Sequence, residues 1–168
     1  RIVRGVLIEI GYTHKEYGID ANNCKIISHI EKQSLEISQG VNKGEGEFKE
    51  QGAGDQGMMF GYASNETEEL MPLPISLAHK LTKKLSTIRK EKKLDYLRPD
   101  GKAQVTVEYE NNKPKRIHTI VLSTQHDENI NYSKIKEDMI EHVITPICED
   151  YIDKDTIFLI NPTGKFVL

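Results

Sequence analysis

The sequence predicts an α+β fold, a two-layer domain with helices on one face of a mainly antiparallel sheet. Three observations predict it. A segment that begins at Pro74 and another over residues 133–147 carry apolar residues three or four positions apart, the spacing of amphipathic helices. Residues 103–109 alternate between apolar and polar side chains, as in a half-buried strand. A turn and a second apolar run follow directly, so we expect a hairpin with the helices packed on one of its faces.

Length and composition limit the possible classes of protein. At 168 residues the chain can form one domain, or one complete domain and part of another. The net charge of −3 gives no basic field for nucleic acid, so we expect no nucleic-acid partner. Residues 2–8 are apolar but too short to span a membrane, and we expect no membrane association. Cys24 and Cys148 form no metal motif and are interpreted as reduced thiols of a cytoplasmic protein.

The first third of the chain has weaker signals. Residues 1–12 carry apolar side chains at helical spacing, which predicts a short helix ending at Gly11. Residues 33–51 are polar and glycine-broken, a composition that cannot bury enough apolar surface to order itself. A structureless stretch of this length is either a disordered linker or a functional lid. Residues 58–63 are a short apolar run that we interpret as a buried strand.

The helix that starts at Pro74 is predicted to be amphipathic. Its apolar stripe consists of Ile75, Ala78, Leu81, Leu85 and Ile88. The opposite face is basic over residues 80–93. These cations could bind phosphate, but we favour a solvated face whose charges suit the carboxyl end of a helix.

The second half of the chain supplies the rest of the sheet and a second helix. A turn at residues 110–114 returns the chain into a strand over 116–123. The second helix should begin with Ser133 as its N-cap and be disturbed near its end by Pro146. Residues 156–160 form a final strand. The side chains that this helix is expected to bury are Ile135, Met139, Val143, Ile144 and Ile147.

A glycine cluster surrounds one carboxylate, Asp55, within residues 50–62. Glycines allow a ligand to approach the main chain closely. Their spacing matches G-x-G-x-x-G, but no strand precedes it and no helix follows, so a dinucleotide loop is disfavoured. A P-loop is excluded because no Gly-Lys-Ser/Thr follows. From the residues alone, Asp55 is equally a ligand-binding carboxylate or a turn-capping aspartate.

Residues 52–63, Gly-Ala-Gly-Asp-Gln-Gly-Met-Met-Phe-Gly-Tyr-Ala, resemble the signature of S-adenosylmethionine synthetases (methionine adenosyltransferases). Motifs in the family's order extend the resemblance over nearly the whole chain. They include Ser38-Gln39-Gly40, Leu97-Arg98-Pro99-Asp100, Ser123-Thr124-Gln125-His126 and Asn161-Pro162-Thr163-Gly164-Lys165-Phe166. The family's amino-terminal His-Pro-Asp stretch and its later Gly-Gly-Gly-Ala-Phe-Ser-Gly-Lys-Asp segment have no counterpart. The resemblance therefore implies the middle part of a longer enzyme.

The resemblance also implies a domain organisation. Residues 1–48 would be the end of the N-terminal domain and its flexible active-site loop, with a strand over residues 25–30. Residues 49–160 would be the central domain, and residues 161–168 the start of the C-terminal domain. In this arrangement the polar stretch 33–51 is a lid rather than a linker.

The activity implied is a transferase reaction, the formation of S-adenosylmethionine from ATP and L-methionine with release of phosphate and diphosphate. Asp55 would face the ammonium group of methionine and Gln39 its carboxylate. Lys102 would meet the triphosphate, so Lys102 and Asp55 are the implied catalytic residues. The implied ATP-binding residues are Asp100, Gly101, Lys102, Lys165 and Phe166, with the Phe166 ring stacked on adenine. Gly101 replaces the alanine or serine more usual in the family.

Without the resemblance, each of these residues has an ordinary interpretation. Gln39 is then a loop glutamine, Lys102 a surface lysine at the start of a strand, and Phe166 a core residue. The histidines show no metal-ligand spacing and are interpreted as packing or surface groups: His14, His29, His79, His118, His126 and His142.

The resemblance further implies Mg²⁺ and K⁺, with most of their ligands outside this chain and no metal ligand among its own residues. It implies a homodimer or a dimer of dimers, because the family's sites form between subunits. We expect the isolated chain to be inactive. The alternative function is a non-catalytic nucleotide-binding or dimerisation module of the same fold.

Overall fold

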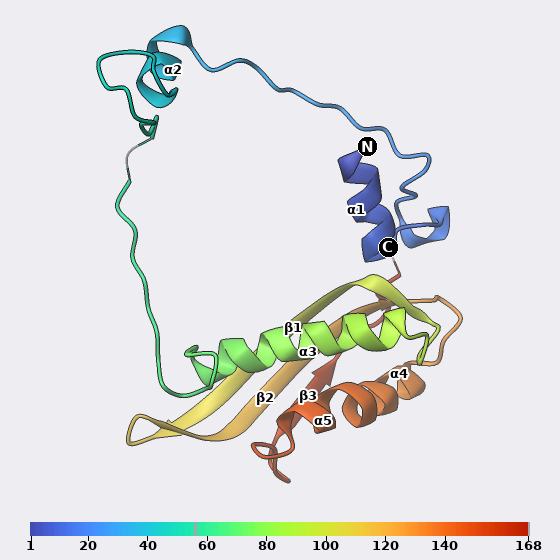
Figure 1. Ribbon diagram of the computed structural model, residues 1–168. Helices are drawn as coiled ribbons and strands as arrows, with labels where there is room; N and C mark the ends of the chain where they lie inside the picture. Colours follow the sequence, from blue (N-terminus) through green and yellow to red (C-terminus); the bar gives the residue numbers. More distant parts are fainter. Residues whose placement is uncertain (56, 168) are drawn as a thin grey trace. The chain divides into compact units, whose positions relative to one another are not determined.

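The computed structural model describes residues 1–55 and 57–167 (Figure 1). The chain forms two compact units: Arg1–Cys24 with Ala63–Leu168, called the sheet unit here, and Lys25–Tyr62, called the loop unit. Most of the regular structure belongs to the sheet unit. None of the described helices is long and apolar enough to cross a membrane.

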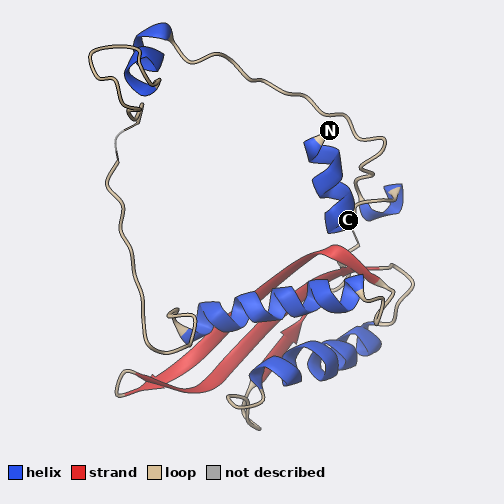
Figure 2. Cartoon of the chain, viewed as in Figure 1, coloured by secondary structure: helices blue, strands red, loops and turns tan. Residues whose placement is uncertain are grey.

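In the described part of the chain, the sheet has three strands in the order β1-β2-β3 (Figure 2). β1 (Leu97–Glu110) and β2 (Lys113–His126) form the predicted hairpin, and both strands are longer than expected. Its turn is tight because Asn111 (φ 52°) and Asn112 (φ 59°) both adopt the left-handed conformation, which matches the twist of the flanking strands. β3 (Ile157–Ile160) pairs in parallel with β2, with Val121 opposite Leu159.

A parallel pair needs a crossover connection, and the second predicted helix provides it. This connection consists of α4 (Tyr132–Met139), a π-helical turn η2 (Ile140–Ile144) and α5 (Thr145–Cys148). Pro146 has no N–H to donate, and the wide turn lies immediately before it, so the predicted disturbance is confirmed. The N-cap is Asn131 rather than Ser133, because the Asn131 side chain accepts the N–H of Ser133 at 2.8 Å.

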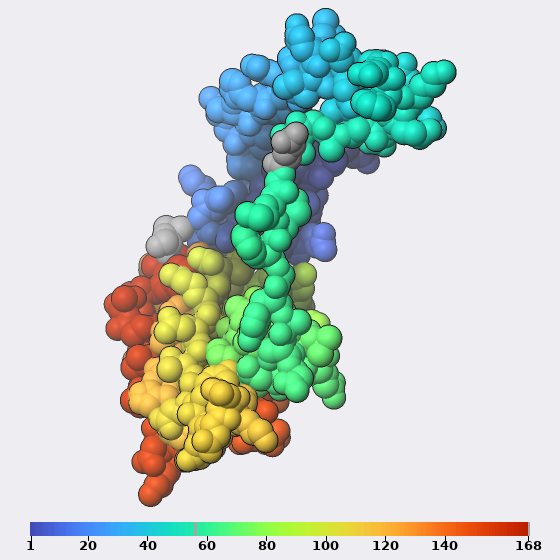
Figure 3. Space-filling model, turned by 90° about the vertical axis from the view of Figure 1, so that its left-hand side faces the viewer, coloured from blue at the N-terminus to red at the C-terminus, as the bar shows by residue number. Residues whose placement is uncertain are grey.

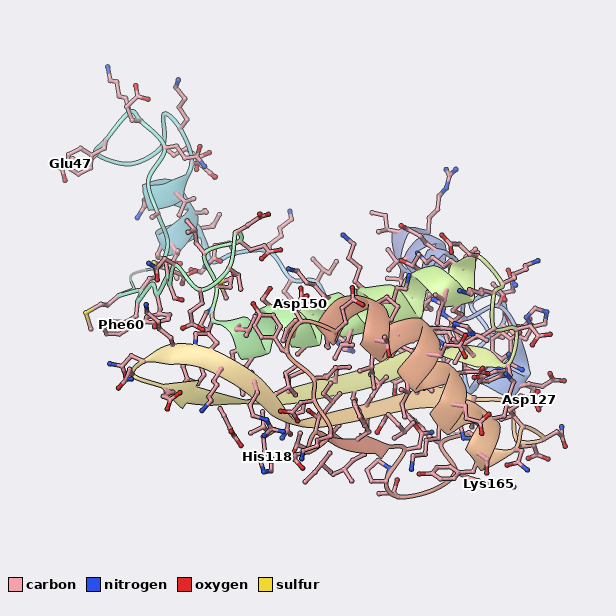
Figure 4. The ribbon with its side chains drawn as sticks, turned by 90° about the horizontal axis from the view of Figure 1, so that it is seen from below. Glu47, Phe60, His118, Asp127, Asp150 and Lys165 are labelled. Atoms are coloured by element: carbon pink, nitrogen blue, oxygen red, sulfur yellow. The ribbon has the colours of Figure 1, made fainter. Side chains whose placement is uncertain are left out.

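α3 (Leu73–Lys90) is the long amphipathic helix predicted from Pro74. Figures 1 and 4 show α3 and the α4–α5 connection on the same face of the sheet, so the two-layer α+β fold is confirmed. Ile75 was expected in the buried stripe but is 39% exposed, and Leu77 is buried instead. The core between the layers includes Leu77, Leu81, Ile88, Ile117, Ile120, Leu122, Ile135, Met139, Val143, Ile144 and Ile160.

The segment before α3 packs beside the hairpin. The Tyr109 hydroxyl donates to Glu66 at 2.6 Å, and Figure 3 shows this green segment alongside the yellow hairpin. Glu66 also accepts the N–H of Leu73, the first residue of α3. The carboxylate therefore joins the tip of the sheet to the start of the helix.

The amino-terminal part of the sheet unit contains α1 (Ile2–Ile10) and a short 3₁₀ turn, η1 (Lys15–Tyr17). As predicted, α1 ends at Gly11, which has φ 113° and donates its N–H to Leu7. The Arg89 guanidinium donates to the carbonyl of Ile10 at 2.6 Å. A Cβ at Gly11 would meet only the movable end of that arginine, so glycine is favoured there by its left-handed conformation rather than by space.

Three expectations for the first 63 residues are wrong. Residues 25–30 and 58–63 were predicted as strands, but neither pairs with another strand among the described residues. Met59 and Phe60 are each 88% exposed rather than buried. Conversely, the stretch 33–51 contains a helix, α2 (Leu35–Val41), where we predicted no structure. An apolar run becomes a strand only where a partner satisfies its backbone, and local sequence does not contain that information.

Candidate functional site

The end of β2 is where three separate segments of the sheet unit meet. Antiparallel pairing places the start of β1 beside it, with Lys102 opposite Ser123 and Gly101 opposite Thr124. Parallel pairing places the end of β3 on its other side, with Ile160 opposite Leu122. The chain after β3 continues along the same end, and Figure 4 shows Lys165 and Asp127 there together. The predicted ATP-binding residues of segments 100–102 and 165–166 are thus brought to one end of the sheet.

Lys102 and Phe166 make the most informative contact at this end. The Lys102 ammonium lies 5.0 Å from the centroid of the Phe166 ring. Lys102 is exposed and Phe166 is half-buried. Lys102 forms no ion pair with any described residue, so its charge is available to an anion. A cation therefore lies over an aromatic ring at the surface.

Arg98 lies close by but is held by other groups. Its guanidinium pairs with Asp127 at 2.9 Å and lies 4.6 Å from the centroid of the Tyr17 ring. The Asn129 N–H, with a further contribution from Arg98, holds the pKa of Asp127 below its usual range. Because its side chain is only 15% exposed and already paired, Arg98 is a structural cation here.

Asp100 and Gly101 line a small hollow of about 120 Å³ between α3 and β1. Asp100 is exposed, and its N–H donates to Gln125 at 3.4 Å. A Cβ at Gly101 would lie 3.2 Å from the Leu85 methyl group, so the missing side chain relieves a tight contact with α3. Lys165 is exposed beside this end of the sheet.

The other two candidates belong to the loop unit. Asp55 is exposed and lines a hollow of about 320 Å³ with Ser38, Val41 and Asn42. Gln39 lies on α2 and is exposed, but it does not line that hollow.

One glycine of the cluster is explained by packing within this unit. A Cβ at Gly52 would lie 2.0 Å from the carbonyl oxygen of Gly40, and the Gly52 N–H donates to Val41. Gly52 is therefore required by the close approach of two backbone segments.

Comparison with known proteins decides the family. The sequence profile described as "S-adenosylmethionine synthetase, central domain" matches residues 50–166. The chain belongs to the S-adenosylmethionine synthetase family.

Bacterial relatives agree with this assignment, and each is named S-adenosylmethionine synthase. The chain is 57% identical to the protein of Finegoldia magna, over 99% of its own length and 45% of the relative. It is 55% identical to that of Desulfosudis oleivorans, over 99% of its own length and 43% of the relative. It is 52% identical to that of Clostridium botulinum, over 100% of its own length and 45% of the relative. The chain thus spans less than half the length of these relatives.

Two buried residues at this site of the synthetase chain had no predicted role. Gln125 and His126 are each 4% exposed and sit at the end of β2. Their side chains hydrogen-bond to the backbone of both predicted ATP-binding segments. The sequence contained them in the Ser123–His126 motif, but His126 was interpreted as a packing or surface group. The motif supports the resemblance but assigns the two residues no role, because their partners are distant in the sequence.

The described residues contain no cluster of three metal-binding side chains. Within residues 1–55 and 57–167, no three histidine, cysteine, aspartate or glutamate side chains are close enough together to hold an ion.

Proposed function

We propose that the chain is part of a methionine adenosyltransferase that forms S-adenosylmethionine from ATP and L-methionine and releases phosphate and diphosphate. The observation that carries this proposal is the 5.0 Å contact between Lys102 and Phe166, residues from two distant segments. An ammonium suits triphosphate oxygens, and an aromatic face suits a purine. The names of the bacterial relatives support the same activity.

The proposed chemistry needs positioning more than it needs a protein nucleophile. The methionine sulfur forms a bond to the 5′ carbon of ATP, and the bond from that carbon to the triphosphate oxygen breaks. Negative charge then grows on the departing oxygen, where a fixed cation lowers the barrier. We assign this neutralisation to Lys102, with Asp100, Gly101 and Lys165 as further ATP contacts and Phe166 as the stacking ring. Water then cleaves the triphosphate to phosphate and diphosphate.

The loop unit would bind methionine. We assign the ammonium group to Asp55, since a charge-assisted hydrogen bond to a carboxylate is the strong form of this contact. Gln39 would bind the methionine carboxylate. The exposure of both side chains supports this assignment, because a substrate can reach them.

Cofactors, assembly and domains belong to the same proposal. Mg²⁺ and K⁺ would be bound mainly by residues outside this chain, and we derive no step through them.

A homodimer or dimer of dimers is supported by the sheet face opposite the helices, where Ile157 and Leu159 are 45% and 41% exposed. We keep a central domain over residues 49–160, between an N-terminal part (1–48) and a C-terminal start (161–168). The profile match over residues 50–166 supports the start of that central domain. Two free thiols favour the cytoplasm.

The test uses the enzyme from its complete reading frame. Purified protein is given ATP, methionine, Mg²⁺ and K⁺, and S-adenosylmethionine is measured by chromatography and mass spectrometry. Absence of product from a folded wild-type enzyme would reject the proposal.

Two variants separate the assigned roles. Asp55→Asn removes the charge opposite the substrate ammonium, so kcat/KM for methionine should fall roughly ten- to a hundred-fold with little change in ATP binding. Lys102→Ala should mainly slow the triphosphate steps. Asp150→Asn and Lys113→Ala are exposed controls outside the assigned ATP and methionine residues and should match wild type. Unchanged methionine kinetics in Asp55→Asn would reject its assignment even if the enzyme is active.

A further inference from the structure

Gln125 and His126 end β2 between the two segments to which we assign ATP. Each is 4% exposed, although both side chains are polar. Buried polar groups are retained where they are hydrogen-bonded, so their partners indicate their purpose. In both residues the partners are backbone groups of neighbouring segments rather than core side chains.

Gln125 bridges the two segments with one amide group. Its oxygen accepts the N–H of Asp100 at 3.4 Å, and its nitrogen donates to the carbonyl of Val167 at 3.1 Å. The same nitrogen lies 3.4 Å from the carbonyl of Tyr17. One rigid planar group thus contacts the backbone of the segment that contains Lys102 and of the segment that contains Phe166.

His126 hydrogen-bonds to both the carbonyl and the N–H of Phe166. The His126 N–H donates to the Phe166 carbonyl at 3.0 Å, and ring Nε2 accepts the Phe166 N–H at 3.1 Å. Because Nε2 accepts, the proton of the neutral ring is on Nδ1, which donates to the carbonyl of Asp127 at 2.7 Å. The imidazole is therefore fixed at both nitrogens.

We propose that Gln125 and His126 are positioning residues that set the separation between the triphosphate cation Lys102 and the adenine-stacking ring of Phe166. The inference rests on the proposed function of those two residues. ATP must meet both at once, so a Phe166 segment that moves freely binds it less well. Neither positioning residue contacts the reacting atoms in this scheme.

Two amide substitutions at His126 test the ring nitrogens separately. In His126→Gln the side-chain oxygen reaches the place of Nε2 and can accept the Phe166 N–H. In His126→Asn the shorter amide reaches the place of Nδ1 and can keep only the bond to Asp127. The two variants have similar chemistry, so they differ mainly in the bond to Phe166.

The measurement is calorimetric binding of AMPPNP to the complete enzyme, together with KM for ATP and for methionine. His126→Asn should bind AMPPNP about tenfold more weakly, because the part-buried Phe166 N–H loses its acceptor and the Phe166 segment is held less firmly, and its KM for ATP should rise in parallel. His126→Gln should stay close to wild type. KM for methionine should change in neither, because the assigned methionine residues belong to the loop unit.

The outcomes distinguish this inference from the proposed function. A folded wild-type enzyme that makes no S-adenosylmethionine overturns both. An active wild type with equal AMPPNP affinities for His126→Asn and His126→Gln overturns the positioning role alone. If circular dichroism shows that His126→Asn is unfolded, Gln125→Met decides instead. Weaker AMPPNP binding with unchanged KM for methionine then supports the inference, and unchanged AMPPNP affinity overturns it.

Discussion

Replacing Asn161 with alanine should be among the most destabilising single changes at the end of the sheet. Asn161 is 1% exposed and follows β3 directly. Its side-chain oxygen accepts the N–H of Thr124 at 2.9 Å, and its nitrogen donates to the carbonyl of Thr124 at 3.0 Å. Its backbone has φ 41°, in the left-handed region that asparagine tolerates better than alanine.

The expected cost follows from these three contributions. Alanine leaves the buried N–H and carbonyl of Thr124 without partners, at about 1–2 kcal/mol each. The left-handed backbone adds about 1 kcal/mol for a residue with an ordinary Cβ. The sum is about 3–5 kcal/mol, a large part of the 5–15 kcal/mol that typically stabilises a domain.

Urea denaturation followed by circular dichroism measures this change, with the midpoint and slope fitted together. Asn112→Ala is the matched control, because Asn112 also has positive φ (59°) but is exposed in the hairpin turn. It should cost only the backbone contribution, about 1 kcal/mol. Asn161→Gly removes the backbone contribution and keeps the loss of both bonds, so it should cost about 2–4 kcal/mol. If Asn161→Ala were no more costly than Asn112→Ala, the two bonds to Thr124 would contribute nothing and the reasoning would fail.

Three other predictions follow from packing and charge. Arg116 binds Asp153 through two nitrogens, both at 2.6 Å, and these bonds lower the pKa of Asp153. The unfolded state therefore binds more protons, so the stabilisation is present above the ordinary aspartate pKa of about 3.9 and is lost as pH falls below it. Asp153→Asn should lower Tm at pH 7, and the gap from wild type should close in acid; a gap independent of pH contradicts this. Burial raises the pKa of the Cys148 thiol to about 12, so a thiol reagent should label half-buried Cys24 in the native chain and Cys148 only after urea unfolding. Labelling of Cys148 at the native rate of Cys24 would refute this. Ile120→Ala, at a fully buried position of β2, should cost about 2–5 kcal/mol in the same urea assay, and a cost below 1 kcal/mol would place Ile120 outside the core.

The sequence by itself determined the elements whose signals are local. The helix from Pro74, the hairpin and the second helix were all predicted, because helical spacing and strand alternation depend only on which face of an element is buried. The helical end at Gly11 was also predictable, since glycine tolerates the left-handed conformation that ends a helix. The candidate site residues came from motifs in a family's order, which needs no structure.

Only the tertiary structure decided which segments have partners. Residues 58–63 carry a strand-like apolar run, yet they stay exposed because no strand pairs with them among the described residues. Asn131 and Ser133 are both good N-cap residues, and in the structure Asn131 has the extended backbone and the side-chain bond of a cap. The parallel pairing of β3 with β2 likewise depends on contacts between residues that are distant in the sequence.

The same limit explains the site. Lys102 and Phe166 were each predictable as candidates, but their 5.0 Å contact depends on strand pairing that brings two distant segments to one end of the sheet. The motif that contains Gln125 and His126 did not reveal their role, because their hydrogen-bond partners are backbone groups, which have the same chemistry at nearly every position of a sequence. Sequence can therefore name the groups that would contact a substrate, whereas the residues that hold those groups in place become visible only once the chain has folded.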